Sequence, residues 1–387
     1  MVSKVSIKNF KSVVDLELEL GKVNVFIGEN GCGKTNILEA ITCLGVSTLS
    51  GSFDINSGVE TFDIEKRLQL SITLMSLKGI RASDSDMLKT AFRPSSKDNN
   101  LKPYIYCTNQ NNEPYGIEIG KKRNDFWEIE ARAIIPNKLS QPLKNEAKED
   151  GQSYISSFSL LDKLFSKNTI TSFLNYTPEN HFLRRFEEEG QLKPLGIRGE
   201  GLFKHLMEIY KKNPELLEQI SEKLRLIGWF DGLEIPKDLF FTEKRLNLKD
   251  KYLPHLEYFD QRSANEGFLY LLFYFTLFIS PYTPNFFAID NIDNALNPKL
   301  GAELIRQLTT IAKENGKQAI LTTHNPAILD GLDLTDDDQR LFTIYRNADG
   351  HTVAKRVKPP KKVKGVETIR LSEAYIRGYL GGIPKNF

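Results

Sequence analysis

Eight residues near the N-terminus have the types and spacing of a loop that binds phosphate groups. Gly28-Glu29-Asn30-Gly31-Cys32-Gly33-Lys34-Thr35 matches the pattern G-x-x-x-x-G-K-[ST]. Glycines let successive backbone N–H groups turn toward phosphate oxygens, a lysine neutralises their charge, and a threonine hydroxyl can bind Mg²⁺. We therefore expect the stretch from Asn30 to Thr35 to hold the phosphates of ATP.

A second reactive group follows the apolar run Phe286–Ile289, which predicts a short buried strand. Asp290 comes directly after this run. A magnesium triphosphate site needs a carboxylate at the end of a neighbouring strand to hold the water shell of the metal. We therefore pair Asp290 with Thr35 as the protein groups of the Mg²⁺ site. The alternative is a strand that merely ends in Asp, which is common for so short a pattern.

A histidine follows a third buried run. Gln318–Thr322 predicts a strand, and His324 comes two residues after it. An imidazole at that position can hydrogen-bond a γ-phosphate or an attacking water. Because Asn325 and Pro326 can start the next helix, the alternative is that His324 is a loop residue beside a helix cap.

The same stretches predict the elements that bring these groups together. Val14–Leu20 alternates apolar and acidic residues, which is typical of a half-exposed strand, and Val23–Ile27 predicts a buried strand before the loop. Helical spacing of apolar residues predicts a helix over Lys34–Leu44, and another over Pro298–Asn315 that stops at Gly316. Strands that alternate with helices indicate an α/β fold.

Composition restricts the class of protein. With 387 residues, 40% of them hydrophobic, the chain is large enough for a packed core of one to three domains. The net charge of +2 argues against a surface built throughout to coat nucleic acid, so such binding needs a local patch.

The apolar run Phe268–Ile279 is shorter than the roughly 20 residues of a membrane span and predicts a buried helix. Three cysteines without a C-x-x-C pair, and no export signal, favour the cytoplasm.

Taken in order, these segments resemble one family of nucleotide-binding proteins. They are similar to ABC-type ATPases of the SMC, RecF and overcoming-lysogenization-defect (OLD) group, most closely the stand-alone OLD-like ATP-binding proteins of bacterial anti-phage defence loci. Val5–Ser12 resembles the opening strand of the group, Asp290–Pro298 its Walker B and D-loop segments, and Thr322–Pro326 its switch-histidine segment.

The resemblance implies a fold and a division into domains. The fold is an α/β P-loop ABC-type ATPase head, with residues 1–45 and 260–387 as the two halves of its core. Residues 46–259 are expected to form an inserted β lobe and helical lobe. Alternating stretches such as Leu68–Leu74 and Pro103–Cys107 fit the β lobe. Two helices expected between Gly201 and Ile227 fit the helical lobe, the second with Asn213 as N-cap and Pro214 as first residue.

The family also places a signature segment before Walker B, and Ser263–Gly267 resembles a degenerate version of it. The resemblance implies that Asn265 and Gly267 contact the γ-phosphate held by another subunit, so that a homodimer or larger assembly encloses two ATP molecules. Read without the resemblance, this segment is a loop that caps the apolar helix beginning near Phe268.

One position departs from the family pattern. Asn291 stands where family members usually carry a glutamate that polarises the attacking water. An amide can orient water but cannot take its proton, so general-base help worth roughly 10² to 10⁴ in rate is missing. We therefore expect slow hydrolysis, with Asn291 and His324 as catalytic residues and Asp293 as a substitute base. Asn297, where the family often has histidine, fits an N-cap before Pro298.

The function that this resemblance implies is regulation of a separate effector. The leading hypothesis is an ATP-gated dimer that controls another polypeptide, a nuclease, in anti-phage defence. The acidic cluster from Asp333 to Asp338 is better explained as a solvated loop than as a nuclease centre, and the roughly fifty residues after it are too few for the Toprim domain of longer OLD proteins.

Two other functions remain open. The first is a RecF-like repair ATPase that clamps duplex DNA, with Lys355–Lys364, six of whose ten residues are basic, as a candidate contact. That segment is equally well explained as a solvated hairpin edge protected by lysines. The second is a scaffold that binds ATP without hydrolysing it. No membrane partner is expected.

Overall fold

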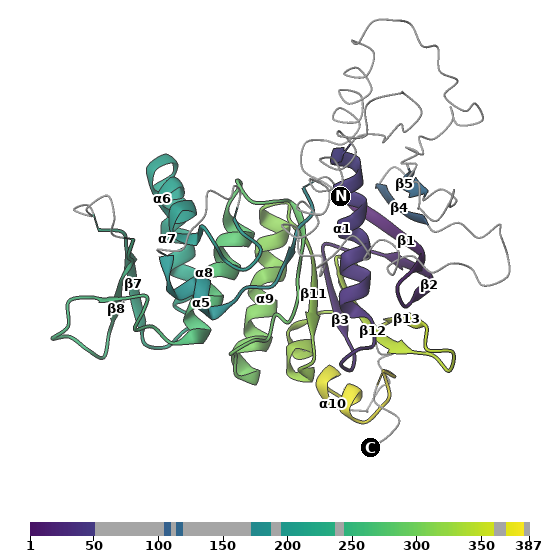
Figure 1. Ribbon diagram of the computed structural model, residues 1–387. Helices are drawn as coiled ribbons and strands as arrows, with labels where there is room; N and C mark the ends of the chain where they lie inside the picture. The colour runs from purple at the N-terminus through teal and green to yellow at the C-terminus, as the bar shows by residue number, and fades with distance from the viewer. Residues whose placement is uncertain are drawn as a thin grey trace, which may run out of the picture.

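The computed structural model describes residues 1–50, 104–109, 114–118, 172–186, 195–236, 244–359 and 369–382. The predicted strand Leu68–Leu74 and residues 360–364 of the basic segment lie outside these ranges. Figure 1 shows a mixed α/β molecule in which helices and a small second sheet cover a central sheet.

The central sheet has six strands in the order β13-β12-β3-β11-β10-β6. β12, β3, β11, β10 and β6 run parallel, and β13 is antiparallel to β12 at one edge. The strands are β3 (Val23–Ile27), β6 (Asn175–Tyr176), β10 (Phe286–Ile289), β11 (Gln318–Thr323), β12 (Gln339–Arg346) and β13 (Thr352–Val357). The predicted strands at Val23–Ile27 and Phe286–Ile289 are confirmed at both ends, and the strand predicted at Gln318–Thr322 is one residue longer.

Both faces of this sheet are covered, which explains its continuous apolar runs. Alternate residues Val23, Val25 and Ile27 belong to the core shared with α8 (Glu266–Ile279) and α9 (Pro298–Glu314). Phe26 points to the other face and packs in the core formed with α1 (Lys34–Ser50). The helix predicted from Lys34 is confirmed at its start and continues past Leu44.

The second sheet is antiparallel and has the order β2-β1-β4-β5. It contains β1 (Val2–Phe10), β2 (Val13–Glu19), β4 (Tyr104–Asn109) and β5 (Pro114–Glu118). The strands predicted at Val14–Leu20 and Pro103–Cys107 therefore form β2 and β4, each shifted by a residue or two. Because β4 pairs with β1 and β6 pairs with β10, strands from the middle of the chain complete sheets begun by its ends.

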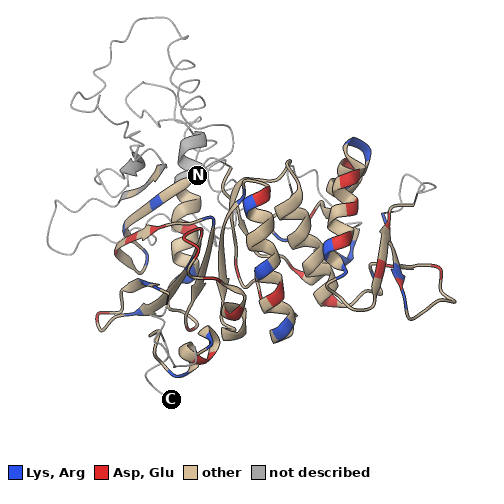
Figure 2. Cartoon of the chain, turned by 180° about the vertical axis from the view of Figure 1, so that it is seen from behind, with Lys and Arg blue, Asp and Glu red and all other residues tan. Residues whose placement is uncertain are grey.

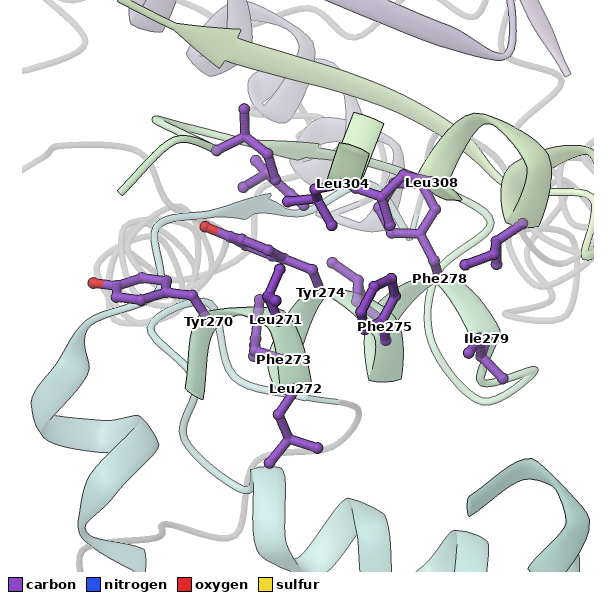
Figure 3. Close-up of a cluster of buried hydrophobic side chains, with 14 of the residues drawn as sticks. Tyr270, Leu271, Leu272, Phe273, Tyr274, Phe275, Phe278, Ile279, Leu304 and Leu308 are labelled. Carbon is purple, nitrogen blue, oxygen red and sulfur yellow. The ribbon is translucent and has the colours of Figure 1, made fainter. Parts of the chain in front are cut away.

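The helical part surrounds α8, which is buried from Phe268 to Ile279. Figure 3 shows its aromatic side chains beside Leu304 and Leu308 of α9. This confirms the predicted buried helix. The neighbouring elements are α5 (Asn180–Arg184), α6 (Leu202–Lys212), α7 (Pro214–Leu224) and the antiparallel sheet of β7 (Phe230–Glu234), β8 (Asn247–Asp250) and β9 (Phe259–Asp260).

The two helices predicted between Gly201 and Ile227 are α6 and α7. Asn213 occupies the N-cap position of α7 and Pro214 is its first residue, as predicted, although the Asn213 side chain makes no capping hydrogen bond. The buried face of α7 consists of Leu217, Ile220 and Leu224.

Charged residues of both signs are mixed along the described part of the chain. Figure 2 shows basic and acidic residues interspersed over the described helices and strands, which agrees with the net charge of +2. In the described part of the chain, no helix combines the length and apolar character that a membrane span requires. A 3₁₀-helix η2 (Pro326–Gly331) lies between β11 and β12, and the short helix α10 (Leu371–Ile376) follows β13.

Candidate nucleotide site

The predicted site residues meet at one edge of the central sheet. β11 pairs in parallel with both β10 and β3, with Leu321 opposite Ile289 and Thr323 opposite Ile27. The carboxyl ends of these strands therefore lie together, and the phosphate-loop pattern, Asp290 and His324 all follow directly from them. In open parallel sheets, ligands bind outside this edge.

The backbone of the loop requires its glycines. Gly31 and Gly33 have φ angles of +75° and +108°, which side chains disfavour. A Cβ atom at Gly33 would lie 2.0 Å from Thr352 Oγ1, and one at Gly28 would lie 2.0 Å from the Ile344 carbonyl oxygen. The loop ends where α1 begins, so the positive end of the helix dipole is available to an anion.

Lys34 is buried at the centre of this loop, with 4% of its surface exposed. Its Nζ atom donates to the carbonyl oxygens of Gly28 and Glu29 at 2.9 and 3.0 Å, and lies 3.3 Å from His324 Nδ1.

Burial lowers the pKa of Lys34, although the Asp290 carboxylate opposes this. Burial, together with Lys34, lowers the pKa of His324, so its imidazole is neutral at pH 7. Burial also raises the pKa of the Cys32 thiol, which keeps it protonated.

Asp290 lies opposite the first turn of α1. Its Oδ2 atom accepts a hydrogen bond of 3.0 Å from Thr35 Oγ1, and its Oδ1 atom accepts one from Thr322 Oγ1. The Thr35 hydroxyl and the buried Asp290 carboxylate offer two hard oxygen ligands on the same side of the site, and Mg²⁺ prefers such ligands. Among the described residues, no cluster of three or more His, Cys, Asp and Glu can hold a metal. Mg²⁺ would therefore have to share its shell with phosphate oxygens and water, as it usually does.

The residues after Asp290 are held by β11. The backbone N–H of Asn291 donates to Thr322 Oγ1 at 2.9 Å, and Asn291 has a φ angle of +58°. Asp293 Oδ1 accepts from Thr323 Oγ1 at 2.7 Å. Asn291, Asp293 and His324 are thus all fixed around the same strand end, but their catalytic roles remain predictions.

The segment similar to a signature lies beside the residues that follow Asp290. A Cβ atom at Gly267 would be 3.0 Å from the Ala295 carbonyl oxygen. Arg184 supports the segment by donating to the Ala264 carbonyl at 2.8 Å. Asn265 Oδ1 accepts from the Phe268 amide at 2.8 Å, so its role as the cap of α8 is confirmed. A contact of Asn265 and Gly267 with a nucleotide stays a prediction.

Several smaller predictions are confirmed. Asn297 caps α9 by accepting from the Leu300 amide at 3.0 Å, with Pro298 as first residue. Asn325 caps η2 in the same way. The acidic cluster is a loop, in which Asp336 pairs with Lys313. The start of the basic segment lies on the edge strand β13, where Arg356 pairs with Asp337 at 3.0 Å.

Sequence reasoning missed four residues that shape the site: Ser12, Thr322, Arg346 and Thr352. Thr322 holds both Asp290 and the Asn291 amide, and a hydroxyl that ends a strand beside the predicted histidine was its one local signal. Arg346 and Thr352 bind the loop from more than 300 residues away. No periodicity or spacing motif reports a contact at that separation.

Comparison with known proteins assigns the chain to a family. Residues 23–330 match the family described as "AAA domain, putative AbiEii toxin, Type IV TA system". The chain belongs to this AAA-domain family. The family match covers the loop, Asp290 and His324 together.

Shorter stretches of this AAA-domain protein resemble curated relatives. The OLD nuclease of Thermus scotoductus is 32% identical over 74 residues, which are 19% of this chain and 14% of that protein. The DNA replication and repair protein RecF of Bacillus cytotoxicus is 47% identical over 47 residues, 12% of this chain and 13% of that protein. The chain thus matches only about one seventh of the length of these relatives.

Solved structures agree on the fold. An SMC head bound to the C-winged helix domain of ScpA aligns with a TM-score of 0.51 at 15% identity, over 92% of this chain and 97% of that one. An SMC head with an extended coiled coil, bound to the C-terminal domain of ScpA derived from Pyrococcus furiosus, gives a TM-score of 0.51 at 13% identity, over 92% and 96%. The AAA-domain protein has a P-loop ABC-type ATPase fold.

Proposed function

We propose that this chain is an ATPase subunit that binds Mg²⁺-ATP between the loop Gly28–Thr35 and Asp290 and hydrolyses it slowly. The observation that carries the proposal is the contact between Thr35 Oγ1 and Asp290 Oδ2, since it joins two separately predicted groups at 3.0 Å. Family membership and the ABC-type fold support ATP as the nucleotide.

Each group has a defined task in this proposal. The loop amides and the N-terminus of α1 bind the phosphates, and Lys34 exchanges its carbonyl partners for phosphate oxygens. Mg²⁺, when bound with the nucleotide, neutralises phosphate charge. The neutral His324 donates a hydrogen bond toward the γ-phosphate, and the Asn291 amide oxygen orients the attacking water. Asp293 is the available carboxylate, but its hydrogen bond from Thr323 restrains it.

The second part of the proposal concerns assembly. Asn265 and Gly267 lie at the N-terminal end of α8 on an exposed or half-exposed surface. In a head-to-tail homodimer, this end meets the γ-phosphate held by the partner subunit, and the helix dipole favours that contact. Asn291 then favours a long-lived closed state over rapid turnover.

The cellular role is proposed from resemblance. The match to an OLD nuclease and the AAA-domain family support a cytoplasmic subunit that regulates a separate effector, a nuclease, in anti-phage defence. The match to RecF favours the alternative of a clamp on duplex DNA, with the basic edge of β13 as contact. Duplex binding that falls steeply with salt, and that Lys355→Ala together with Arg356→Ala weakens, would select the clamp.

The division into a core of residues 1–45 and 260–387 and an insertion of residues 46–259 remains part of the proposal. Strands β4, β5 and β6 nevertheless contribute to the sheets of the core. The insertion is therefore expected to depend on the core for its own folding.

Phosphate release from ATP by the purified full chain, with Lys34→Ala as control, tests the activity. We expect slow Mg²⁺-dependent release from the wild type and none above background from Lys34→Ala. If the wild type releases no phosphate although ATP raises its melting temperature, the scaffold explanation replaces the ATPase.

A further inference from the structure

The backbone of a phosphate-binding loop has an unavoidable structural requirement. When its N–H groups turn inward toward the anion, its carbonyl groups turn outward and need donors of their own. In this chain, the Gly28 and Glu29 carbonyls take theirs from Lys34. Lys34 must leave those carbonyls, at least in part, to reach phosphate oxygens. The rest of the loop therefore needs donors that stay in place.

Two residues of the hairpin β12–β13 supply these donors. Arg346 donates from Nε and Nη2 to the Gly31 carbonyl at 3.1 and 3.0 Å. Its Nη1 atom donates to the Gly350 carbonyl in the hairpin turn at 2.7 Å, which fixes the guanidinium in place. Thr352, which is 1% exposed, donates from Oγ1 to the Cys32 carbonyl at 2.9 Å.

The hairpin is itself tied to the neighbouring sheet and to α1. The Thr352 amide donates to the Ser12 carbonyl at 2.8 Å, and the two hydroxyls lie 2.7 Å apart. Asn36 of α1 donates to Ser12 Oγ at 2.6 Å. Thr352 therefore stands at the junction of the loop, the β1–β2 turn and the first turn of α1.

The close approach of the hairpin also accounts for two glycines of the motif. The Ile344 carbonyl occupies the space of a side chain at position 28, and Thr352 Oγ1 occupies that space at position 33. Gly31, by contrast, has nothing within 4 Å of its would-be Cβ, so its φ of +75° is what requires glycine there. The hairpin thus fills the side-chain space at both ends of the loop, whereas at Gly31 it binds the carbonyl and leaves the Cβ side open.

We infer that Arg346 and Thr352 are positioning residues for the phosphate-binding loop, and that the β12–β13 hairpin holds the loop ready for the nucleotide. They act through the Gly31 and Cys32 carbonyls, on the outer side of the loop, and touch no reacting atom. The inference rests on the proposed function for the identity of the ligand, but not for the rigidity of the loop.

Substitutions on the hairpin separate this role from general stability. Thr352→Val removes the hydroxyl and keeps the shape, and Thr352→Ser restores the hydroxyl. Arg346→Ala removes the fork that binds Gly31. Arg356→Ala is the matched control, because Arg356 lies on the same hairpin but pairs with Asp337 and Glu19 instead of the loop.

Two measurements are made on each full-length variant: hydrogen exchange of amides 28–33 without nucleotide, and the Kd for Mg²⁺-ATPγS. Arg346→Ala and Thr352→Val should each speed exchange and raise Kd about tenfold, since a hydrogen bond is lost at the loop. Thr352→Ser and Arg356→Ala should behave like the wild type. Wild-type exchange and affinity in both loop variants would overturn the inference.

The design distinguishes the two levels of proposal. If the wild type does not bind Mg²⁺-ATPγS, the proposed function fails, while exchange of amides 28–33 still decides the positioning role. If Arg346→Ala does not fold, the Thr352→Val and Thr352→Ser pair decides alone. If Thr352→Ser changes exchange and Kd as much as Thr352→Val does, the Thr352 hydroxyl is not what holds the loop.

Discussion

Asn291 combines an unusual side chain with an unusual backbone. Its φ of +58° lies in the left-handed region, which asparagine adopts more readily than most residues. Its amide is fixed by Thr322 Oγ1 at 2.9 Å, so the conformation belongs to the strand end that also holds Asp290. A residue that tolerates this backbone therefore occupies the position where related ATPases usually carry a catalytic glutamate.

Replacing this residue tests the proposal that a missing base makes turnover slow. Asn291→Glu should raise the rate of phosphate release by about 10² or more, because a carboxylate can take the proton of the attacking water. The same change should lower the free energy of unfolding by about 1 kcal/mol, since glutamate is disfavoured at positive φ. Asn291→Gly, which relaxes the backbone without adding a base, is the control and should not be faster. Unchanged turnover by a glutamate variant that still binds ATP would refute the missing-base explanation.

At this scale, sequence reasoning reached the groups that it predicts to bind phosphate and Mg²⁺. Lys34, Thr35 and Asp290 sit at spacings that their chemistry imposes, and the structure brings them together. Arg346 has no such local constraint, and Thr322 has only its place at a strand end beside His324. Their roles depend on contacts that exist only after the sheet has formed.

Among the elements, α9 shows how a position in the D-loop-like segment can have a purely structural reason. Asn297 accepts from the Leu300 amide, and Pro298 begins the helix with no amide to satisfy. The cap fixes the direction in which the chain leaves the segment after Asp290.

Removing the cap should therefore affect stability rather than chemistry. Asn297→Ala should lower the free energy of unfolding by about 1 kcal/mol, measured by urea denaturation, and leave the rate of phosphate release unchanged. Asn294→Ala, at an exposed position of the same segment, serves as the comparison. A fall in turnover with unchanged stability would instead assign Asn297 a role at the nucleotide.

Elements with their own signal were predicted well. α8 is apolar on every side and α9 has a cap and a terminal glycine, so both could be recognised from local sequence. Strands β4 and β6 pair with β1 and β10, which lie about 100 residues away along the chain. Periodicity can propose a strand there, but only tertiary packing determines its partner.

For the molecule as a whole, the central question is whether ATP brings two chains together. The surface at Ser263, which is exposed before α8, is expected to face the partner's γ-phosphate. Ser263→Glu places a negative charge there without disturbing the core. The wild type should double its mass by light scattering with Mg²⁺ and a nonhydrolysable ATP analogue, while Ser263→Glu should remain monomeric and still bind nucleotide. Ser263→Ala is the control for loss of the hydroxyl. If Ser263→Glu dimerises as well as the wild type, the proposed head-to-tail homodimer is contradicted.

The most direct measurement is a crystal structure of the full chain with a nonhydrolysable ATP analogue and Mg²⁺. We expect a triphosphate enclosed by the amides of residues 30–35, with the metal on the side of Thr35 and Asp290 and with Lys34 turned from the Gly28 carbonyl to phosphate oxygen. Density for the nucleotide elsewhere, or a metal remote from Asp290, would contradict it.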